Sequence, residues 1–598
     1  MGRRISFLLA LCVWVLYVVA AAADNSTGGI IIDLGYGIYT GVHETSSGLD
    51  IWRGIRYAAP PLGKLRWQVP QPPSSSSDDP PILADKFGPA CPQTLSATPG
   101  ASSVFIPGNE DCLFLNVYSP AVRKQAGVLL PVMVVIHGGG YGLGTAGLDI
   151  TEFLRENSNG LVAVTIQYRL GAFGFLASAE VKSRGVLNAG LLDQQFALQW
   201  VQKHIGKFGG DPRRVTISGE SAGAGSVLLH AIARDGGLGT ELFQNIIAAS
   251  PWIPTQSRYH DALVTRHYYD FSALVGCPTR GNVFDCLTSK DSLVLQYAAN
   301  LVSTTTPTPH GNWAFIPVTD GEYITGPPSV LLQQGRVNGI RLLAGNNANE
   351  GSIIPPSTIR TQNDLVTWLK QNFPNLSKKN ITSVLEAYPS FSGPVDPTAA
   401  RYETNGYGPG TAVNISQVAT GQQQRCFNIY AEASVICPSY WFASAFTGND
   451  RTAYHYQYSV PFSVHAADLS AYYGPPTENQ GPDLVTAFRK IYGNFVSSGN
   501  PSISNQEANG RSGTVGSLLG DNPASNWPAW TNSNPSLLNL NQTGGVPYTV
   551  MTSAGVPVTQ FRGPGLRNNF TLVNAYMWEG GRGQRCEFWR KISPFIPQ

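Results

Sequence analysis

The segment Arg214-Val-Thr-Ile-Ser-Gly-Glu-Ser-Ala-Gly223 places Ser221 between two glycines in a G-x-S-x-G pattern. The β-branched residues in its first half predict a buried strand, and Ala224-Gly-Ser-Val-Leu-Leu-His230 is able to begin a helix. A strand, a tight turn and a helix in this order form a nucleophile elbow, which exposes the serine hydroxyl. Because 64 of the 598 residues are glycine, the pattern needs support from the rest of the chain.

The remaining sequence indicates an α/β protein. Residues 129–136 and 160–168 are continuous apolar runs, which are typical of strands buried on both faces. Residues 191–204 repeat apolar side chains at helical spacing, and residues 340–344 and 452–458 are further expected strands. This alternation predicts a mostly parallel central sheet with helices on both faces. Residues from about 355 to 450 are more helical and rich in loops, as in a large insertion.

The composition allows a large core and excludes some partners. The chain is 42% hydrophobic and 13% charged, with a formal net charge of +2. This balance gives no support for nucleic acid or an anionic surface as a partner. No repeat or clear linker divides the chain, so we expect one catalytic domain over residues 24–598. The oligomeric state stays open.

Residues 1–23 have the three parts of a secretion signal. Gly2-Arg-Arg4 carries positive charge, residues 5–19 are apolar, and Ala20-Ala-Ala-Ala23 supplies small residues for cleavage. A signal anchor is the alternative, but the apolar run is short for a membrane-spanning helix. The C-terminus lacks the long apolar tail of a glycolipid-anchor signal. We therefore expect a secreted, extracellular protein without a stable membrane anchor.

Cysteines and glycosylation motifs agree with secretion. One of the eight cysteines, Cys12, lies in the signal, so the other seven leave at least one unpaired within the chain. In an oxidising compartment the close pairs are expected to form the disulfides Cys91–Cys112 and Cys277–Cys286, and spacing leaves the others open. The N-x-S/T motifs predict glycosylation at Asn25, Asn375, Asn380, Asn414, Asn541 and Asn569.

An elbow serine needs a histidine to accept its proton, and in this chain order the histidine comes last. Only His455 and His465 lie in the last third of the chain. His455 lies inside the Tyr-rich strand predicted for residues 452–458, so we expect it to be packed. His465 follows that strand in a loop, from which it is able to reach the elbow. We expect His465 to be the base.

The histidine needs a carboxylate that orients it. Glu350 lies on the loop that follows the expected strand at residues 340–344. Sites in α/β proteins lie at the carboxyl ends of strands, so Glu350 is the expected acid. Asp320 and Glu322 are the alternatives, although carboxylates are common in turns of this kind.

A glycine-rich loop predicts an oxyanion hole, that is, N–H groups that bind a developing negative charge. His137-Gly-Gly-Gly-Tyr141 directly follows the strand expected to end at Ile136. The expected donors are the backbone amides of Gly139, Gly140 and Ala222. A plain loop or a phosphate cradle is the alternative. Neither explains why the loop is paired with an elbow, and no G-K-S/T follows.

Several further motifs resemble one family along nearly the whole mature chain. They are Gly54-Ile-Arg-Tyr-Ala-Ala-Pro-Pro-Leu-Gly-Lys-Leu-Arg-Trp67, Glu110-Asp-Cys-Leu-Phe-Leu-Asn-Val117, Asn188-Ala-Gly-Leu-Leu-Asp-Gln194, Phe208-Gly-Gly-Asp-Pro212 and Cys586-Glu-Phe-Trp589. Together with the elbow and the glycine-rich loop, they resemble the type-B carboxylesterase/lipase family, the cholinesterase-like branch of the α/β-hydrolases. The extra loops suggest a fungal secreted member.

The resemblance implies an α/β-hydrolase fold and a Ser221–Glu350–His465 triad that forms an acyl-enzyme, with no metal and no cofactor. It also implies a third disulfide, Cys437–Cys586, which leaves Cys426 as the odd thiol. Glu220 and Ser226 match positions that support the family's site. Their alternative is the ordinary polarity of a turn and a helix.

The expected function is hydrolysis of a small-molecule or lipid carboxylic ester. Phe105 is the only aromatic residue between Cys91 and Cys112, and the absence of a tryptophan there argues against choline esters. This short loop, rich in Pro, Gly and Ser, favours a general carboxylesterase over a triacylglycerol or sterol-ester lipase with a long amphipathic lid. Trp252 could line an acyl pocket or pack in the core. The presence of all the expected site residues argues against a non-catalytic adhesion protein.

Overall fold

The computed structural model describes residues 30–74, 80–97, 105–122, 127–305, 313–390, 411, 413, 417–510, 521–552 and 555–596. The signal predicted at residues 1–23 and the sequons at Asn25 and Asn414 lie outside these residues. Within them, no helix combines the length and the apolar character needed to cross a membrane.

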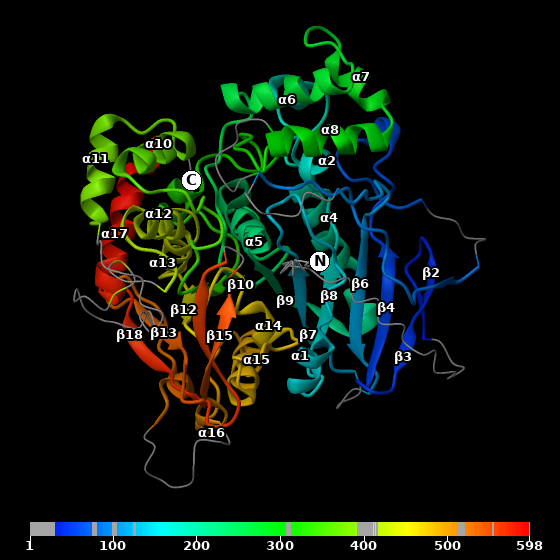
Figure 1. Ribbon diagram of the computed structural model, residues 1–598. Helices are drawn as coiled ribbons and strands as arrows, with labels where there is room; N and C mark the ends of the chain where they lie inside the picture. The colour runs from blue at the N-terminus through cyan, green and yellow to red at the C-terminus, as the bar shows by residue number, and fades with distance from the viewer. Residues whose placement is uncertain are drawn as a thin grey trace, which may run out of the picture.

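An eleven-stranded sheet forms the centre of the molecule (Figure 1). Its strands are, in spatial order, β18 (Thr571–Asn574), β13 (Ser536–Leu540), β12 (Thr452–Tyr458), β11 (Arg341–Asn347), β10 (Asn245–Ala249), β9 (Gly210–Glu220), β7 (Leu130–Ile136), β8 (Val162–Ile166), β6 (Phe114–Pro120), β4 (Leu49–Arg56) and β3 (Val42–Glu44). The strands from β13 to β8 are parallel to their neighbours, which confirms the predicted parallel centre. The pairings beyond β13 and β8 are antiparallel, and these edges were not predicted.

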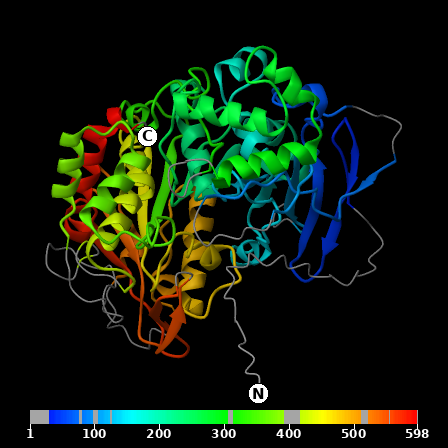
Figure 2. The same ribbon diagram turned by 45° about the horizontal axis from the view of Figure 1, so that its top comes forward.

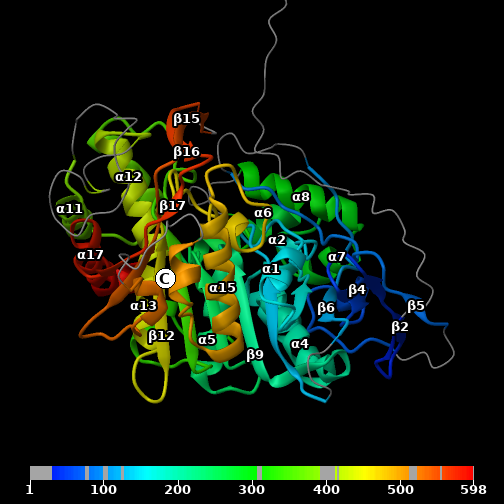
Figure 3. The same ribbon diagram turned by 90° about the horizontal axis from the view of Figure 1, so that it is seen from below.

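Helices cover both faces of the sheet, and each face has its own apolar core. Alternate residues of β7 belong to different cores: Val132 and Val134 to one, Met133 and Val135 to the other. The first core includes α4 (Ala189–His204) and α5 (Ala222–Ile232), and the second includes α1 (Thr151–Glu156) and α15 (Pro482–Ser498). Figure 3 shows α1 and α15 next to each other. Burial on both faces explains why β7 is a continuous apolar run.

Two groups of helices lie on either side of α5 in Figure 1. One contains α6 (Ala262–Leu274), α7 (Val283–Ser289) and α8 (Ser292–Thr305). The other contains α10 (Gln362–Asn372), α11 (Lys378–Ala387), α12 (Gly421–Ala431), α13 (Cys437–Ala445) and α17 (Trp578–Ile592). Figure 2 shows them as separate clusters. In the second group, α10 to α13 confirm the helical character predicted between residues 355 and 450.

The structure contains three disulfides, Cys91–Cys112, Cys277–Cys286 and Cys437–Cys586. Among the described residues, Cys426 is a free and buried thiol. Cys437–Cys586 joins α13 to α17 across 149 positions of the chain. In the chain-entropy model, a cross-link over so long a loop contributes about 4–5 kcal/mol to stability.

The structure contradicts one of the glycosylation predictions. Asn541 directly follows β13 and its exposed fraction is 0%. A fully buried side chain offers no surface on which the folded chain could carry a glycan. Asn375 is exposed, and Asn380 and Asn569 are partly exposed.

Candidate active site

Ser221 lies at a sharp turn between β9 and α5, as the sequence predicts for an elbow. Its backbone has φ 58° and ψ −124°, a conformation that a residue with a side chain rarely adopts. The flanking glycines are required by close packing. A Cβ atom on Gly219 would lie 2.3 Å from the carbonyl carbon of Gly223, and one on Gly223 would lie 2.2 Å from the carbonyl oxygen of Ile136. The elbow therefore fits only glycine at these two positions.

The structure brings Ser221, His465 and Glu350 together. His465 lies on the loop after β12, and its Nε2 atom is 2.7 Å from the Ser221 hydroxyl oxygen. Its Nδ1 atom is 2.5 Å from Oε2 of Glu350, which lies just beyond the end of β11. Glu350 is fully buried. Because the three strands are parallel, their carboxyl ends meet at one edge of the sheet and these side chains meet there.

The other candidates have different roles. His455 is fully buried inside β12, with its Nε2 atom 2.8 Å from the hydroxyl oxygen of Ser439, so it is packed as expected. Asp320 accepts hydrogen bonds from Asn188 and from three backbone amides of its own turn. Glu322 is exposed and pairs with Lys182. Asp320 and Glu322 are therefore a turn carboxylate and a surface carboxylate.

Two further residues hold Glu350, and the sequence did not reveal them. The Ser250 hydroxyl donates a hydrogen bond to Oε1 of Glu350 at 2.6 Å, and the backbone N–H of Asn347 donates to the same oxygen at 2.5 Å. Ser250 directly follows β10, and Asn347 is the last residue of β11. Their position at the carboxyl ends of strands was the only available signal, and it is not specific.

Buried carboxylates make His465 a strong base. Burial alone would lower the pKa of His465, but the adjacent Glu350, together with Glu220 and Asp468, raises it to about 9. Burial raises the pKa of Glu220 to about 8, although the nearby His465 lowers it in part. Oε1 of Glu220 lies 3.7 Å from Nε2 of His465. The Glu220 carboxylate thus lies beside the His465 ring.

Ser226 lies deeper, in the core behind the nucleophile. It is fully buried in α5 and accepts a hydrogen bond from Nε2 of Gln194 at 3.1 Å. The Gln194 side-chain oxygen lies 2.8 Å from Nε2 of His230, whose Nδ1 atom is 2.7 Å from the Tyr323 hydroxyl. Ser226 therefore joins a buried polar chain that ties α5 to α4.

The glycine-rich loop runs beside the nucleophile. A Cβ atom on Gly138 would lie 3.1 Å from Cβ of Ser221. Gly139 and Gly140 have φ values of 103° and 64°, in the region that favours glycine. Neither of their amides donates a hydrogen bond to another described residue. Ala222 is the first residue of α5, where the helix dipole favours a negative charge. These amides are therefore available to an oxyanion.

A tryptophan that the sequence did not reveal covers this loop. A Cβ atom on Gly140 would lie 1.9 Å from the Trp313 ring, and one on Gly142 would lie 2.3 Å from it. The indole N–H of Trp313 donates to the carbonyl oxygen of Thr94 at 2.7 Å. The Thr94 amide in turn donates to the carbonyl oxygen of Gly142. Thr94 of the Cys91–Cys112 loop is therefore bonded both to Trp313 and to the glycine-rich loop. Only the tertiary structure brings these segments together.

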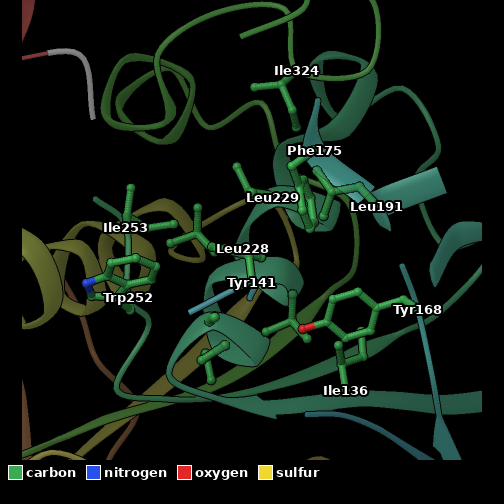
Figure 4. Close-up of a cluster of buried hydrophobic side chains, with 14 of the residues drawn as sticks. Ile136, Tyr141, Tyr168, Phe175, Leu191, Leu228, Leu229, Trp252, Ile253 and Ile324 are labelled. Atoms are coloured by element: carbon green, nitrogen blue, oxygen red, sulfur yellow. The ribbon is translucent and has the colours of Figure 1, made fainter. Parts of the chain in front are cut away.

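Trp252 packs in the core next to Trp313. Its exposed fraction is 2%, and its indole N–H donates to the Tyr430 hydroxyl at 2.9 Å. Its ring lies 5.8 Å from that of Trp313 and 5.9 Å from that of Tyr141. Figure 4 shows Trp252 and Tyr141 within the apolar cluster that also contains Leu228 and Leu229 of α5. Each large side chain buried in this way contributes about 1.5–3 kcal/mol.

The described part of the chain holds no cluster of three or more His, Cys, Asp or Glu side chains that could bind a metal ion.

Comparisons with known proteins identify the family of this chain. The model of the carboxylesterase family matches residues 31–553. Lipase 5 of Diutina rugosa is 32% identical over 366 residues, which are 57% of this chain and 66% of the lipase. The acetylcholinesterase of Bungarus fasciatus is 29% identical over 533 residues, covering 82% of this chain and 78% of that protein. The match thus spans about two thirds of the length of the lipase.

The fold is also similar to that of a solved structure. The crystal structure of EstA from Aspergillus niger has a TM-score of 0.70 and 25% sequence identity, and the match covers 95% of this chain and 99% of that one. The parallel centre of the sheet, the helices on both faces and the elbow after β9 are those of the α/β-hydrolase fold. This chain belongs to the carboxylesterase family.

Proposed function

We propose that this protein is a secreted serine carboxylic ester hydrolase that forms an acyl-enzyme on Ser221. The observation that carries the proposal is the position of His465. One of its ring nitrogens is 2.7 Å from the Ser221 hydroxyl and the other is 2.5 Å from a fully buried carboxylate. This arrangement turns a poor nucleophile into an effective one. The disulfides and the signal predicted at residues 1–23 support secretion.

In the first half of the reaction, the Ser221 oxygen attacks the ester carbonyl carbon while Nε2 of His465 takes the hydroxyl proton. The carbonyl electron pair moves to the oxygen, and the amides of Gly139, Gly140 and Ala222 bind the resulting negative charge. Glu350 stabilises the imidazolium. When the tetrahedral intermediate collapses, the bond to the alcohol oxygen breaks, His465 gives that oxygen its proton, and the alcohol leaves.

In the second half, His465 takes a proton from water, and the water oxygen attacks the acyl carbon. The same amides bind the oxyanion. Collapse breaks the bond to the Ser221 oxygen, which regains a proton from His465, and the carboxylic acid is released. Each oxyanion donor contributes about 10²–10³-fold to turnover.

The substrate class we propose is a soluble ester with a short acyl group. Trp313 lies directly on the glycine-rich loop and is held there by Thr94, so its ring occupies space beside the oxyanion donors. A triacylglycerol or sterol-ester lipase is the second candidate, favoured by the similarity to a protein named lipase. A non-catalytic adhesion protein would not need the contact between Ser221, His465 and Glu350.

Hydrolysis of p-nitrophenyl esters from acetate to palmitate tests the proposal, with the Ser221→Ala variant as the control. We expect short chains to react fastest and the variant to be inactive. A preference for long chains that rises above the substrate's solubility limit would favour the lipase instead. If no ester reacts, labelling with diisopropyl fluorophosphate decides, because only an activated serine reacts. An unlabelled, folded protein would overturn the enzyme proposal.

A further inference from the structure

We propose that Asp468 is a positioning residue of this site, which holds the acid Glu350 in place through Asn347 and adds a negative charge behind the histidine. The inference rests on the proposed function and extends it to a residue that touches neither Ser221 nor the oxyanion donors. Asp468 comes three positions after His465, at the start of α14 (Leu469–Tyr472).

Both oxygens of this carboxylate have fixed partners. Asp468 is fully buried. Its Oδ1 atom accepts a hydrogen bond from Nδ2 of Asn347 at 2.9 Å, and its Oδ2 atom accepts one from the Tyr456 hydroxyl at 3.0 Å. The Tyr456 hydroxyl is also 2.8 Å from that of Tyr492 in α15. Burial of a carboxylate is costly unless such partners compensate it, so the position of Asp468 is tightly defined.

Asn347 links Asp468 to the acid Glu350 through hydrogen bonds. Its Nδ2 group donates both to Asp468 and, at 3.1 Å, to the Ser250 hydroxyl oxygen. Because Asn347 supplies a proton to that oxygen, the Ser250 hydroxyl directs its own proton to Oε1 of Glu350, 2.6 Å away. The Asn347 backbone N–H donates to the same Glu350 oxygen. Glu350 therefore depends on the orientation of the Asn347 amide.

The charge of Asp468 selects that orientation. The side-chain oxygen of Asn347 has no hydrogen-bond partner among the described residues, whereas its NH₂ group has two. If the amide were rotated by 180°, its oxygen would face the Asp468 carboxylate and its NH₂ group would lose both acceptors. The amide oxygen of Asn347 carries a partial negative charge and would be repelled by the Asp468 carboxylate. The carboxylate therefore favours the observed orientation of the amide.

Asp468 also belongs to the charge environment of the base. Glu350 from the loop after β11 and Glu220 from β9 are the other carboxylates that face this region, and His465 is the cation-forming group. The surrounding hydroxyls come from β12 and the helices after it: Tyr456, Tyr458, Tyr472 and Tyr492. Burial raises the pKa of Asp468 to about 6, while hydrogen bonds from Asn347 and Tyr456 oppose the rise. Above that pH the carboxylate helps to stabilise the imidazolium of His465.

The test is the Asp468→Asn variant, which keeps the shape of the side chain and removes its charge. We expect kcat to fall about 10-fold or more, with little change in KM, because the acid and the base are less well aligned. We also expect the acid limb of the profile of kcat/KM against pH to move to lower pH, because the imidazolium loses a stabilising charge. A merely structural residue would lower the rate without moving this limb.

Asp211→Asn is the matched control. Asp211 is a largely buried carboxylate on the same strand as Glu220, but at the opposite end of β9, where it pairs with Arg214. Asp211→Asn changes the net charge by the same amount as Asp468→Asn. We expect it to leave the acid limb of the profile of kcat/KM against pH at the same pH. The Asn347→Ala variant should lower kcat as well, and combining it with Asp468→Asn should add little, because both act through one link.

Fluorophosphate labelling and circular dichroism identify the folded variants. Folded, fully labelled Asp468→Asn with wild-type kcat and an unmoved limb would overturn the proposal. If that variant does not fold, Asn347→Ala breaks the link from Asp468 to Ser250 and Glu350 while the charge of Asp468 stays, and kcat should fall about 10-fold with little change in KM. Wild-type kcat in that folded variant would also overturn the proposal. Failure of the proposed function would look different, because the wild-type protein itself would then be neither labelled nor active on esters.

Discussion

The two halves of the candidate site are formed by different chemical groups, ionisable side chains in one and backbone amides in the other. The acid–base half lies on the loops after β11 and β12 and consists of buried ionisable side chains, chiefly Glu350, His465 and Asp468. The oxyanion half lies after β7 and at the start of α5. It consists of backbone amides, and the Trp313 ring packs against the loop that carries two of them. The first half depends on the identity and charge of side chains. The second depends on the path of the backbone, which requires glycine at positions 139 and 140.

The largest loss of activity is expected from a substitution in the acid–base half. Glu350→Gln keeps the size of the side chain but removes the charge that stabilises the imidazolium, and kcat is expected to fall about 10⁴-fold. Hydrolysis of p-nitrophenyl acetate measures the loss. Asp320→Asn is the control, because Asp320 caps its own turn and does not contact His465. An equal loss in the control would mean that the acid has been wrongly assigned.

A smaller effect is expected in the oxyanion half, from a change that alters no charge. Gly140→Ala adds a Cβ atom that would lie 1.9 Å from the Trp313 ring, so the loop has to move and kcat should fall about 10²-fold. Adding Trp313→Ala should recover part of the rate, because the clash is relieved while the positive φ of 64° remains. A Gly140→Ala protein with wild-type kcat would show that this amide is not a donor.

The smallest expected effect is the change of kcat/KM with pH in the wild-type protein. It distinguishes the two halves because only the acid–base half contains groups that titrate. His465 accepts a proton only when neutral, and its pKa is raised to about 9. We therefore expect kcat/KM to rise about 10-fold between pH 7 and 8 and to level off above about pH 9. The amides of the oxyanion half do not titrate in this range. A flat profile between pH 6 and 9 would show that the buried carboxylates do not control the base.

The sequence was most informative where function restricts the residue type. The elbow, the glycine-rich loop and His465 each have a short motif or a fixed place in the chain order, and the apolar runs predicted the parallel centre of the sheet. The antiparallel strands β3, β4 and β6 have weaker patterns at the edge and were missed. The buried Asn541 was wrongly predicted to carry a glycan because a three-residue motif contains no information on burial.

By itself, the sequence determined the family, the parallel core, the elbow and the residues expected to form the triad, because local steric rules and chain order restrict them. Only the tertiary structure decided how these residues are supported. Asn347 at the end of β11 and Ser250 after β10 both bind Glu350, and Asp468 at the start of α14 binds Asn347. Trp313 contacts Gly140 from a distant loop. Hydrogen bonds and contacts of this kind depend on distances in space, and residues far apart in the chain leave no local pattern that reveals them.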